Sequence, residues 1–302
     1  MDLRHLRYFV AIAETGTMAR AAERVHVTQS TLSHQLAQLE RDLGTVLFER
    51  VGRNLRLSDA GNAWLAHARG ILAQVEEARR SIDGIGGLAT GEVKVGAIHS
   101  FVTRLMPDIA AAFVRRHPGI HLQVHEMPGV EIESQVEAGA LDLGFAFYPP
   151  SRARVAGERL FDDTLALAIH DGHPLAGERS VRFAQLAGMP FAMLTARFAT
   201  RRLLDAYFRR AGVSPKVLIE IDSVDALERI AELGVAATFL PRRTTWPRGA
   251  TRLRLIDVTD PRPVRTAGLV WRKTAYRSAA VSAFADHLRS EIARNAESRQ
   301  AS

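Results

Sequence analysis

The chain has 302 residues, a formal net charge of +7 at pH 7 and no cysteine. This length allows two or three domains with their own cores, because single domains cluster near about 100 to 150 residues. The lack of cysteine excludes disulfides, zinc fingers and cysteine nucleophiles, whereas the basic balance fits a polyanionic partner. The first 13 residues lack the apolar run of an export signal and no segment is apolar enough to span a membrane, so we expect a cytoplasmic protein.

Three short helices are predicted in the first 44 residues. Apolar residues recur at helical spacing from Leu3 to Ala13, and Gly16 follows as a residue that tolerates positive φ. Thr17 can cap a second helix, and Thr28 can cap a third helix that ends at Gly44. In the third helix four leucines are spaced to form one buried stripe, so its polar side is left to contact another molecule.

The second and third helices have the spacing of a helix-turn-helix, which presents the start of its recognition helix to base edges in the major groove. Glutamine can pair bidentately with adenine there, and serine can donate or accept. Taken alone, the third helix could also be an ordinary amphipathic helix with a solvated side. The residues of this helix expected to contact DNA are Thr28, Gln29, Ser30, Thr31, Ser33 and His34.

A short basic hairpin is predicted to follow, from Val46 to Leu57. A hairpin of this kind forms a wing whose arginines can lie beside phosphates or in a minor groove. Arginines scattered over an ordinary surface are the alternative interpretation. The expected wing contacts are Arg50, Arg53 and Arg56.

These segments resemble the LysR-type transcriptional regulators over residues 1 to 58. The resemblance lies in A-R-A-A-E-R at 19–24, V-T-Q-S-T-L-S-H-Q-L at 27–36, L-E-R-D-L-G at 39–44, L-F-E-R at 47–50 and L-S-D-A-G at 57–61. It implies a winged helix-turn-helix, a dimerising helix and an effector-sensing region in a ligand-responsive transcription factor. The recognition helix and wing are similar to the branch that contains the cyanate-operon regulator. His34 departs from the family pattern, which usually has a basic residue on this helix.

A long helix is predicted from Asp59 to beyond Arg80, with Ser58 as its cap. Six of its apolar residues are spaced 4, 3, 4, 3 and 4, as in the seam of a two-stranded coiled coil. A helix packed within its own chain is the alternative, although a two-fold DNA site requires a two-fold protein. The expected dimerisation residues are Trp64, Ala68, Ile71, Val75, Ala78 and Ile82, and the expected hinge glycines are Gly84, Gly86, Gly87 and Gly91.

From residue 93 onward, strands and helices alternate, which predicts a mostly parallel sheet covered by helices. The predicted strands are 93–98, 120–125, 143–147, 165–169, 191–194, 217–221, 235–240 and 267–271, and the predicted helices are 105–116, 130–138, 200–211, 224–233 and 278–294. D-L-G-F at 142–145, H-P-L at 173–175 and L-G-V-A-A-T-F-L-P at 233–241 extend the family resemblance, more loosely, to this region. The resemblance implies two lobes like those of periplasmic binding proteins, with crossings near Phe161 and Pro263.

The predicted effector site lies beyond the carboxyl ends of strands, where helix N-termini offer free N–H groups. Hydroxyl groups there can bind a small anion without adding negative charge. Simple helix capping is the alternative role for Ser100 and Thr200, and core packing is the alternative for Phe147 and Phe198. The expected effector residues are Ser100, Thr103, Phe147, Thr195, Phe198 and Thr200. Arg197, Arg201 and Arg202 could add positive charge to the same site or simply be solvated.

No catalytic or metal-binding constellation is evident, because H-E-x-x-H, Walker and G-x-S-x-G patterns are all missing. Asp162, Asp163 and Asp222 are interpreted as caps or turn residues. We therefore expect neither an enzyme nor a cofactor.

The predicted fold class is an N-terminal all-α winged helix-turn-helix (1–58), a long linker helix with a hinge (59–91) and a C-terminal α/β two-lobed effector domain resembling periplasmic binding proteins (92–302). Lobe I spans about 92–161 and 264–294, and lobe II about 162–263. The predicted function is a regulator that binds a two-fold operator on double-stranded DNA as a homodimer or homotetramer, responds to a small anion or carboxylate, and could contact RNA polymerase. The rivals are an architectural DNA binder with a ligand-blind C-terminal domain, and an enzyme or solute-binding protein with a DNA-binding appendage.

Overall fold

The structure is a computed structural model that describes residues 1–51, 54–83, 90–242 and 252–300. The chain divides into an N-terminal unit built mainly on Met1–Ile85 and a larger C-terminal unit built mainly on Gly86–Ser302. In the ranges described, no helix combines the length and the apolar character needed to cross a bilayer.

The N-terminal unit begins with the three predicted helices, α1 (Leu3–Thr15), α2 (Met18–Arg24) and α3 (Gln29–Leu43). Their predicted caps are confirmed: the side chain of Thr17 accepts a hydrogen bond from the backbone of Arg20, and that of Thr28 accepts one from Thr31. Gly16 ends α1 with a φ of 71°, a left-handed conformation that disfavours side chains with a Cβ.

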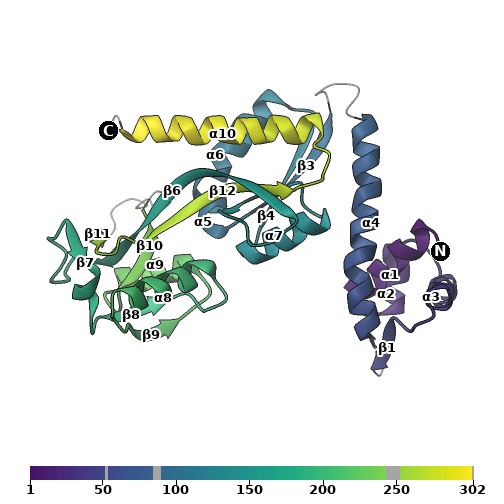
Figure 1. The fold of residues 1–302 in the computed structure, drawn as a ribbon, viewed down its shortest axis with the longest axis horizontal. Coiled ribbons are helices and arrows are strands. Elements are labelled where there is room, and N and C mark those ends of the chain that lie inside the picture. Colours follow the sequence, from purple (N-terminus) through teal and green to yellow (C-terminus); the bar gives the residue numbers. More distant parts are fainter. Residues whose placement is uncertain (52–53, 84–89, 243–251, 301–302) are drawn as a thin grey trace. The chain divides into compact units, whose positions relative to one another are not determined.

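The three helices share one core with the wing and the linker helix (Figure 1). The wing consists of β1 (Phe48–Val51) and β2 (Asn54–Leu57), which pair antiparallel, and the linker helix is α4 (Asp59–Asp83). Leu32, Leu36 and Leu39 of α3 are buried in this core, so the leucine stripe is confirmed. The predicted hinge glycines 84, 86 and 87 lie outside the described residues, and Gly91 begins a strand.

The segment before the wing is held both by α3 and by the start of α4. From α3, the Glu40 carboxylate accepts a hydrogen bond from the Leu47 N–H at 2.8 Å. The Ser58 hydroxyl donates to the Val46 carbonyl at 2.7 Å and accepts from the Gly61 N–H at 3.0 Å. A Cβ atom on Gly61 would lie 2.1 Å from the carbonyl oxygen of Leu47, so only glycine fits here without movement.

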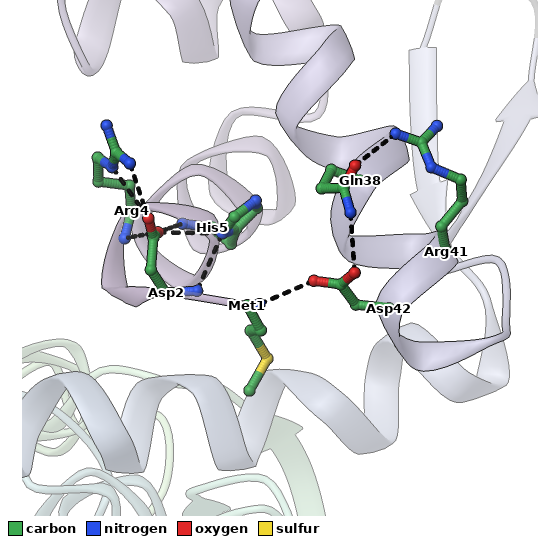
Figure 2. Close-up of polar contacts among 7 residues, drawn as sticks. All are labelled: Met1, Asp2, Arg4, His5, Gln38, Arg41 and Asp42. Atoms are coloured by element: carbon green, nitrogen blue, oxygen red, sulfur yellow. Dashed lines mark hydrogen bonds and ion pairs between the residues drawn. The ribbon is translucent and has the colours of Figure 1, made fainter.

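A polar network joins the start of α1 to the end of α3 (Figure 2). The Met1 amine lies 2.8 Å from the Asp42 carboxylate, which also accepts a hydrogen bond from the Gln38 amide at 2.9 Å. Asp2 caps α1 by accepting from the backbone N–H groups of Arg4 and His5, and it also accepts from the Arg4 guanidinium at 2.9 Å. The side-chain hydrogen bond with Arg4, helped by the two backbone N–H groups, holds the pKa of Asp2 at about 2, below its usual 3.8.

This depressed pKa predicts a pH-dependent contribution of Asp2 to stability. Because the folded pKa is lowered, the contribution is fully present above pH 3.8 and is lost as the pH falls through about 2. Denaturant unfolding of the wild type and of Asp2→Asn between pH 2 and 5 checks this, since asparagine still caps a helix but carries no charge. The stability difference between the two proteins should shrink as the pH falls, and a constant difference would contradict the assigned pKa.

The C-terminal unit is organised around an eight-stranded sheet of order β4-β3-β5-β12-β6-β11-β7, with β10 also paired to β6. The strands are β3 (Gly91–Ala97), β4 (Ile120–Glu126), β5 (Leu143–Phe147), β6 (Val155–His170), β7 (Ser180–Arg182), β10 (Thr238–Pro241), β11 (Leu253–Thr259) and β12 (Val264–Arg272). A separate parallel pair is formed by β8 (Pro190–Met193) and β9 (Lys216–Glu220).

The sheet is mixed, which corrects the prediction of a mostly parallel sheet. β3 pairs parallel with β4 and with β5, as expected for strands joined through helices. β6, however, pairs antiparallel with β10, β11 and β12, and β12 pairs antiparallel with β5. The reason is that β6 pairs with β12 over Val155–Thr164 and then continues into the other half of the unit, where it pairs with β10 and β11 (Figure 1).

Two main hydrophobic cores lie in the two halves of the unit, and β6 contributes residues to both. One gathers β3, β4, β5 and the helices α5 (His99–Arg104), α6 (Met106–Arg116), α7 (Gly129–Ala138) and α10 (Ala279–Gln300). The other gathers β8, η2 (Phe183–Leu186) and α8 (Ala199–Arg210), and α9 (Val224–Glu232) packs in smaller clusters beside it. The predicted helices and strands are all present, whereas α5, β7, β11, η2 and the first half of β6 were not predicted.

Candidate functional site

The polar side of α3 is exposed, as the predicted DNA-contacting surface requires. Thr28, Gln29, Ser30, Thr31, Ser33 and His34 are all exposed. The Thr28 hydroxyl lies 3.0 Å from that of Ser30 and 2.8 Å from that of Thr31, which orders the start of the helix. Ser33 and His34 follow on the first turns, where base edges are contacted in a helix-turn-helix.

The wing presents two of its three predicted arginines. Arg50 on β1 and Arg56 on β2 are exposed, and Arg56 stands directly opposite Glu49 across the hairpin. Arg53 lies outside the described residues. Two exposed arginines therefore remain as cations that can approach phosphates.

The proposed dimer seam on α4 is used in part by the chain itself. Ala68 is fully buried against the core of α1, α2 and α3, and Trp64 and Ile71 are partly buried against the same core. The assignment of Ala68 to a seam between subunits is therefore corrected, because no surface of Ala68 is left for a partner. Val75 is half-buried and Ala78 is exposed, and the side chain of Ile82 lies outside the described part of the helix.

The C-terminal unit contains a cavity of about 400 Å³ bordered by both of its hydrophobic cores. Ligand pockets typically measure about 300 to 1,000 Å³, so the space suits a small organic molecule. The residues that line it come from the carboxyl ends of β4, β5, β8 and β10, from the start of β12, and from the starts of α5, α7, α8 and α9. We call this cavity the cleft.

The starts of α5 and α8 face the cleft without side-chain caps. Their N-cap residues are Ile98 and Phe198, which are apolar and offer no side-chain hydrogen bond. Ser100 and Thr200 therefore do not act as helix caps here, which removes the alternative role considered for them. Uncapped N–H groups and the positive end of a helix dipole favour a negative charge at this place.

Four of the six predicted effector residues line the cleft, namely Ser100, Phe147, Phe198 and Thr200. Thr103 and Thr195 do not line it. The Thr103 hydroxyl instead donates to the carbonyl of His99 at 3.1 Å, and the Thr195 hydroxyl donates to the Asp222 carboxylate. Thr103 lies near the end of α5, and Thr195 lies in the loop between β8 and α8.

A buried ion pair supports one wall of the cleft. Arg265 on β12 and Asp163 on β6 are direct cross-strand partners, and the Arg265 guanidinium donates to the Asp163 carboxylate at 2.9 Å. The same nitrogen of Arg265 donates to the Ser100 hydroxyl at 2.9 Å. The two side chains are 6% and 0% exposed, which corrects the interpretation of Asp163 as a cap or turn residue. Burial lowers the pKa of the Arg265 guanidinium, and the nearby Asp163 carboxylate opposes that change.

The more exposed rim of the cleft carries charges of both signs. Glu126 pairs with His99, whose Nδ1 lies 2.9 Å from the carboxylate, and Asp222 pairs with Arg197 at 3.2 Å. The side chains of Glu126 and Asp222 are 48% and 42% exposed, so water screens their charge more than that of Arg265. We call Ser100 and Arg265 the cleft floor, and Glu126, Arg197 and Asp222 the cleft rim.

Arg265 and Glu126 were missed as site residues for identifiable reasons. Arg265 lies before the apolar run that predicts a strand at 267–271, and the strand begins earlier than that run indicates. Its role depends on Asp163, which is 102 residues away in the sequence. Glu126 ends a correctly predicted strand, and the rule that ligands bind beyond strand ends could have selected it. Among the described residues no group of three histidine, aspartate or glutamate side chains is arranged to hold a metal ion.

Comparison with known families decides the assignment. Residues 3–62 match the family described as "Bacterial regulatory helix-turn-helix protein, lysR family", and residues 86–293 match the family described as "LysR substrate binding domain". The chain belongs to the LysR family of transcriptional regulators. The matched families and relatives are transcriptional regulators and not enzymes. They establish the LysR family but do not confirm membership of the cyanate-operon branch.

Relatives of this LysR protein match along nearly its whole length. It is 30% identical to the RuBisCO operon transcriptional regulator of Allochromatium vinosum, over 97% of each chain. It is also 30% identical to the DNA-binding transcriptional dual regulator OxyR of Escherichia coli (strain K12), over 90% of each chain.

Solved structures agree with this LysR architecture. A full-length OxyR variant from Pseudomonas aeruginosa has a TM-score of 0.76 at 26% identity, covering 96% of this chain and 95% of that one. Full-length CbnR in complex with its target DNA has a TM-score of 0.68 at 25% identity, covering 96% of this chain and all of that one (100%). The expected combination of a helix-turn-helix and a two-lobed, effector-binding-like domain is confirmed.

Proposed function

We propose that this LysR-family regulator senses a small organic anion, most simply a carboxylate, in the cleft of its C-terminal unit. The observation that carries the proposal is the convergence of two uncapped helix starts, those of α5 and α8, on one cavity that also receives the hydroxyls of Ser100 and Thr200. N–H groups and hydroxyls both donate to an anion, and neither brings a negative charge.

The rest of the lining favours an organic effector over a bare inorganic ion. Phe147, Phe198 and Phe239 contribute aromatic surface, and Met127 and Leu194 add aliphatic surface. An apolar body attached to an acidic group would bury against these side chains while the acidic group meets the donors. The lobe boundaries near Phe161 and Pro263 belong to the same proposal, because they place the cleft between lobe I and lobe II.

On DNA, we propose a two-fold operator read by α3 from each of two subunits, in a homodimer or a homotetramer. The exposed start of α3 and the arginines of the wing support this arrangement. Because Ala68 is buried within its own chain, the seam proposed on α4 moves toward Val75 and Ala78. Contact with RNA polymerase and membership of the cyanate-operon branch remain hypotheses beyond this proposal.

The effector proposal is tested by a thermal-shift screen of the full chain with small carboxylates and inorganic anions. We expect at least one carboxylate to raise the melting temperature, because a ligand that binds only the folded state stabilises it. Ser100→Ala and Thr200→Val should each weaken that shift, while Thr103→Val, which changes a threonine outside the cleft wall, should preserve it. A shift that survives both cleft variants would place the site elsewhere.

Binding to DNA gives a separate test. Ser33→Ala and His34→Ala should each weaken operator binding by about 1 to 3 kcal/mol while leaving affinity for random DNA nearly unchanged, because base contacts carry specificity. Electrophoretic mobility or fluorescence anisotropy with matched operator and scrambled duplexes measures both. An equal loss on the two duplexes would refute the assignment of these residues to base reading.

An architectural DNA binder with a ligand-blind C-terminal domain is the second candidate. It predicts weak sequence selectivity and a footprint that no metabolite changes. The uncapped helix starts favour the sensing regulator, since they direct hydrogen-bond donors into the cleft.

A further inference from the structure

We infer that Arg265 is the cation that receives the acidic group of the effector, and that Asp163 is the built-in competitor that pairs with it in the effector-free protein. This inference rests on the proposed function, because it assumes an anionic effector, and it deepens that proposal by naming the residue that recognises the charge.

Arg265 is nearly buried at the wall of the cleft. Its side chain is 6% exposed, yet it lines the cleft, so the little surface it has lies at the cavity wall. The guanidinium lies over the rings of Phe147 and Phe101, with its central carbon 5.3 Å and 5.6 Å from their centroids. These contacts hold the planar group at the floor, where burial strengthens its attraction to an anion.

Ser100 supplies a hydrogen-bond donor beside Arg265, because the contact with Arg265 fixes the direction of the Ser100 hydroxyl. The Ser100 oxygen accepts from Arg265, so its proton is free to be donated elsewhere. Within the described part of the chain no acceptor for that proton is found, and Ser100 is 6% exposed and lines the cleft. The floor therefore presents a cation and a hydroxyl donor together, which select a hydrogen-bond acceptor with negative charge.

Asp163 explains how the floor stays stable without an effector. A buried arginine alone would be costly, and the carboxylate on the neighbouring strand neutralises it. An entering anion must share Arg265 with Asp163, which lowers its affinity. Because the two residues face each other across β6 and β12, this sharing acts directly on the strand pair that links the two halves of the unit.

The test uses crystals of the full chain soaked in rubidium bromide, with anomalous scattering from both ions. Bromide is the anion probe and rubidium reports any preference of the floor for cations. We expect bromide in contact with the Ser100 hydroxyl and the Arg265 guanidinium. Rubidium at the floor would overturn the inference, because it would show that Asp163 dominates the local charge.

The remaining outcomes separate this inference from the proposed function. Bromide found only at the start of α8 would overturn the role of Arg265 and leave an anionic effector in place. Bromide found nowhere in the cleft would overturn both. Either result is read from the wild-type crystal, so it does not depend on any variant folding.

Variants then distinguish recognition from mere structural support. Asp163→Asn should raise bromide occupancy at the floor, because the competitor loses its charge, whereas Arg265→Met combined with Asp163→Val should abolish it. If the pair only held the floor together, the Asp163→Asn variant and the double variant would both disturb the floor and lose bromide. The matched control combines Arg242→Met with Asp257→Asn. This surface ion pair lies outside the cleft lining, so its replacement should leave bromide in place. Bromide retained in the Arg265 and Asp163 double variant would overturn the inference.

Discussion

Replacing Gly61 with alanine is expected to destabilise the N-terminal unit by about 3 kcal/mol, the upper end of the usual cost of overpacking. The added Cβ would lie 2.1 Å from the carbonyl oxygen of Leu47, and a backbone atom cannot rotate away as a flexible side chain could. The start of α4 must then separate from the segment before the wing. Hydrogen exchange of the amides in α1 and α3 measures the loss, since it reports the stability of this unit alone.

Gly70→Ala is the matched control, because it makes the same change further along α4. Apart from the adjoining backbone of α4 itself, no atom lies within 4 Å of the position a Cβ would take at Gly70. Alanine forms helices better than glycine, so this variant should gain about 0.5 to 1 kcal/mol. Equal behaviour of the two variants would refute the close contact between Gly61 and Leu47.

Replacing Arg265 alone with methionine is expected to destabilise the C-terminal unit by about 3 to 5 kcal/mol, the usual cost of leaving a buried charge without its partner. The Asp163 side chain is fully buried, so water cannot replace the lost guanidinium. Adding Asp163→Val should restore most of the stability, because removing both charges of a buried pair is often neutral or stabilising.

Calorimetry of the wild type, the two single variants and the double variant completes a double-mutant cycle for this pair. The coupling between the two substitutions should be large and should stabilise the double variant relative to the sum of the singles. A single Arg265→Met variant as stable as the double variant would show that Asp163 does not depend on this arginine in the folded protein.

The N-terminal unit could be predicted closely because its signals are local. Thr17 and Thr28 cap helices that begin at the next residue, and Gly16 and Gly44 end helices in the left-handed conformation. The leucine stripe of α3 likewise needs only the helical period. Each of these inferences uses residues within a few positions of one another, so no knowledge of the tertiary fold was required.

The predictions that had to be corrected depend on distant partners. A heptad pattern on α4 shows that one side is buried, but it does not say whether the partner is another subunit or α1, which is why Ala68 was misassigned. The Arg265–Asp163 pair requires the antiparallel register of β6 and β12, which no local pattern encodes. Thr103 and Thr195 were chosen because they follow correctly predicted strand ends, but the Thr103 hydroxyl donates to a backbone carbonyl of its own helix and the Thr195 hydroxyl, in the loop before α8, donates to Asp222.

An effector changes transcription only if it favours one arrangement of the protein over another. A coupling of about 1 to 3 kcal/mol would give a 5- to 150-fold response. The cleft floor offers a source for such a difference, because an anion that draws Arg265 from Asp163 alters a contact between the two linking strands. A ligand that binds without disturbing this pair would be expected to occupy the cleft and leave DNA binding unchanged.

The burial of Ala68 against α1, α2 and α3 attaches α4 rigidly to the helices that carry the proposed DNA-reading surface. Its 25 residues give a length of about 37 Å at the usual helical rise. A swing of only about 5° at one end would shift the other by about 3 Å, close to the ~3.4 Å step between stacked bases. In the proposed dimer, a small adjustment at the contact between the two α4 helices would therefore move a subunit by a whole base pair and change the half-site spacing that the protein tolerates.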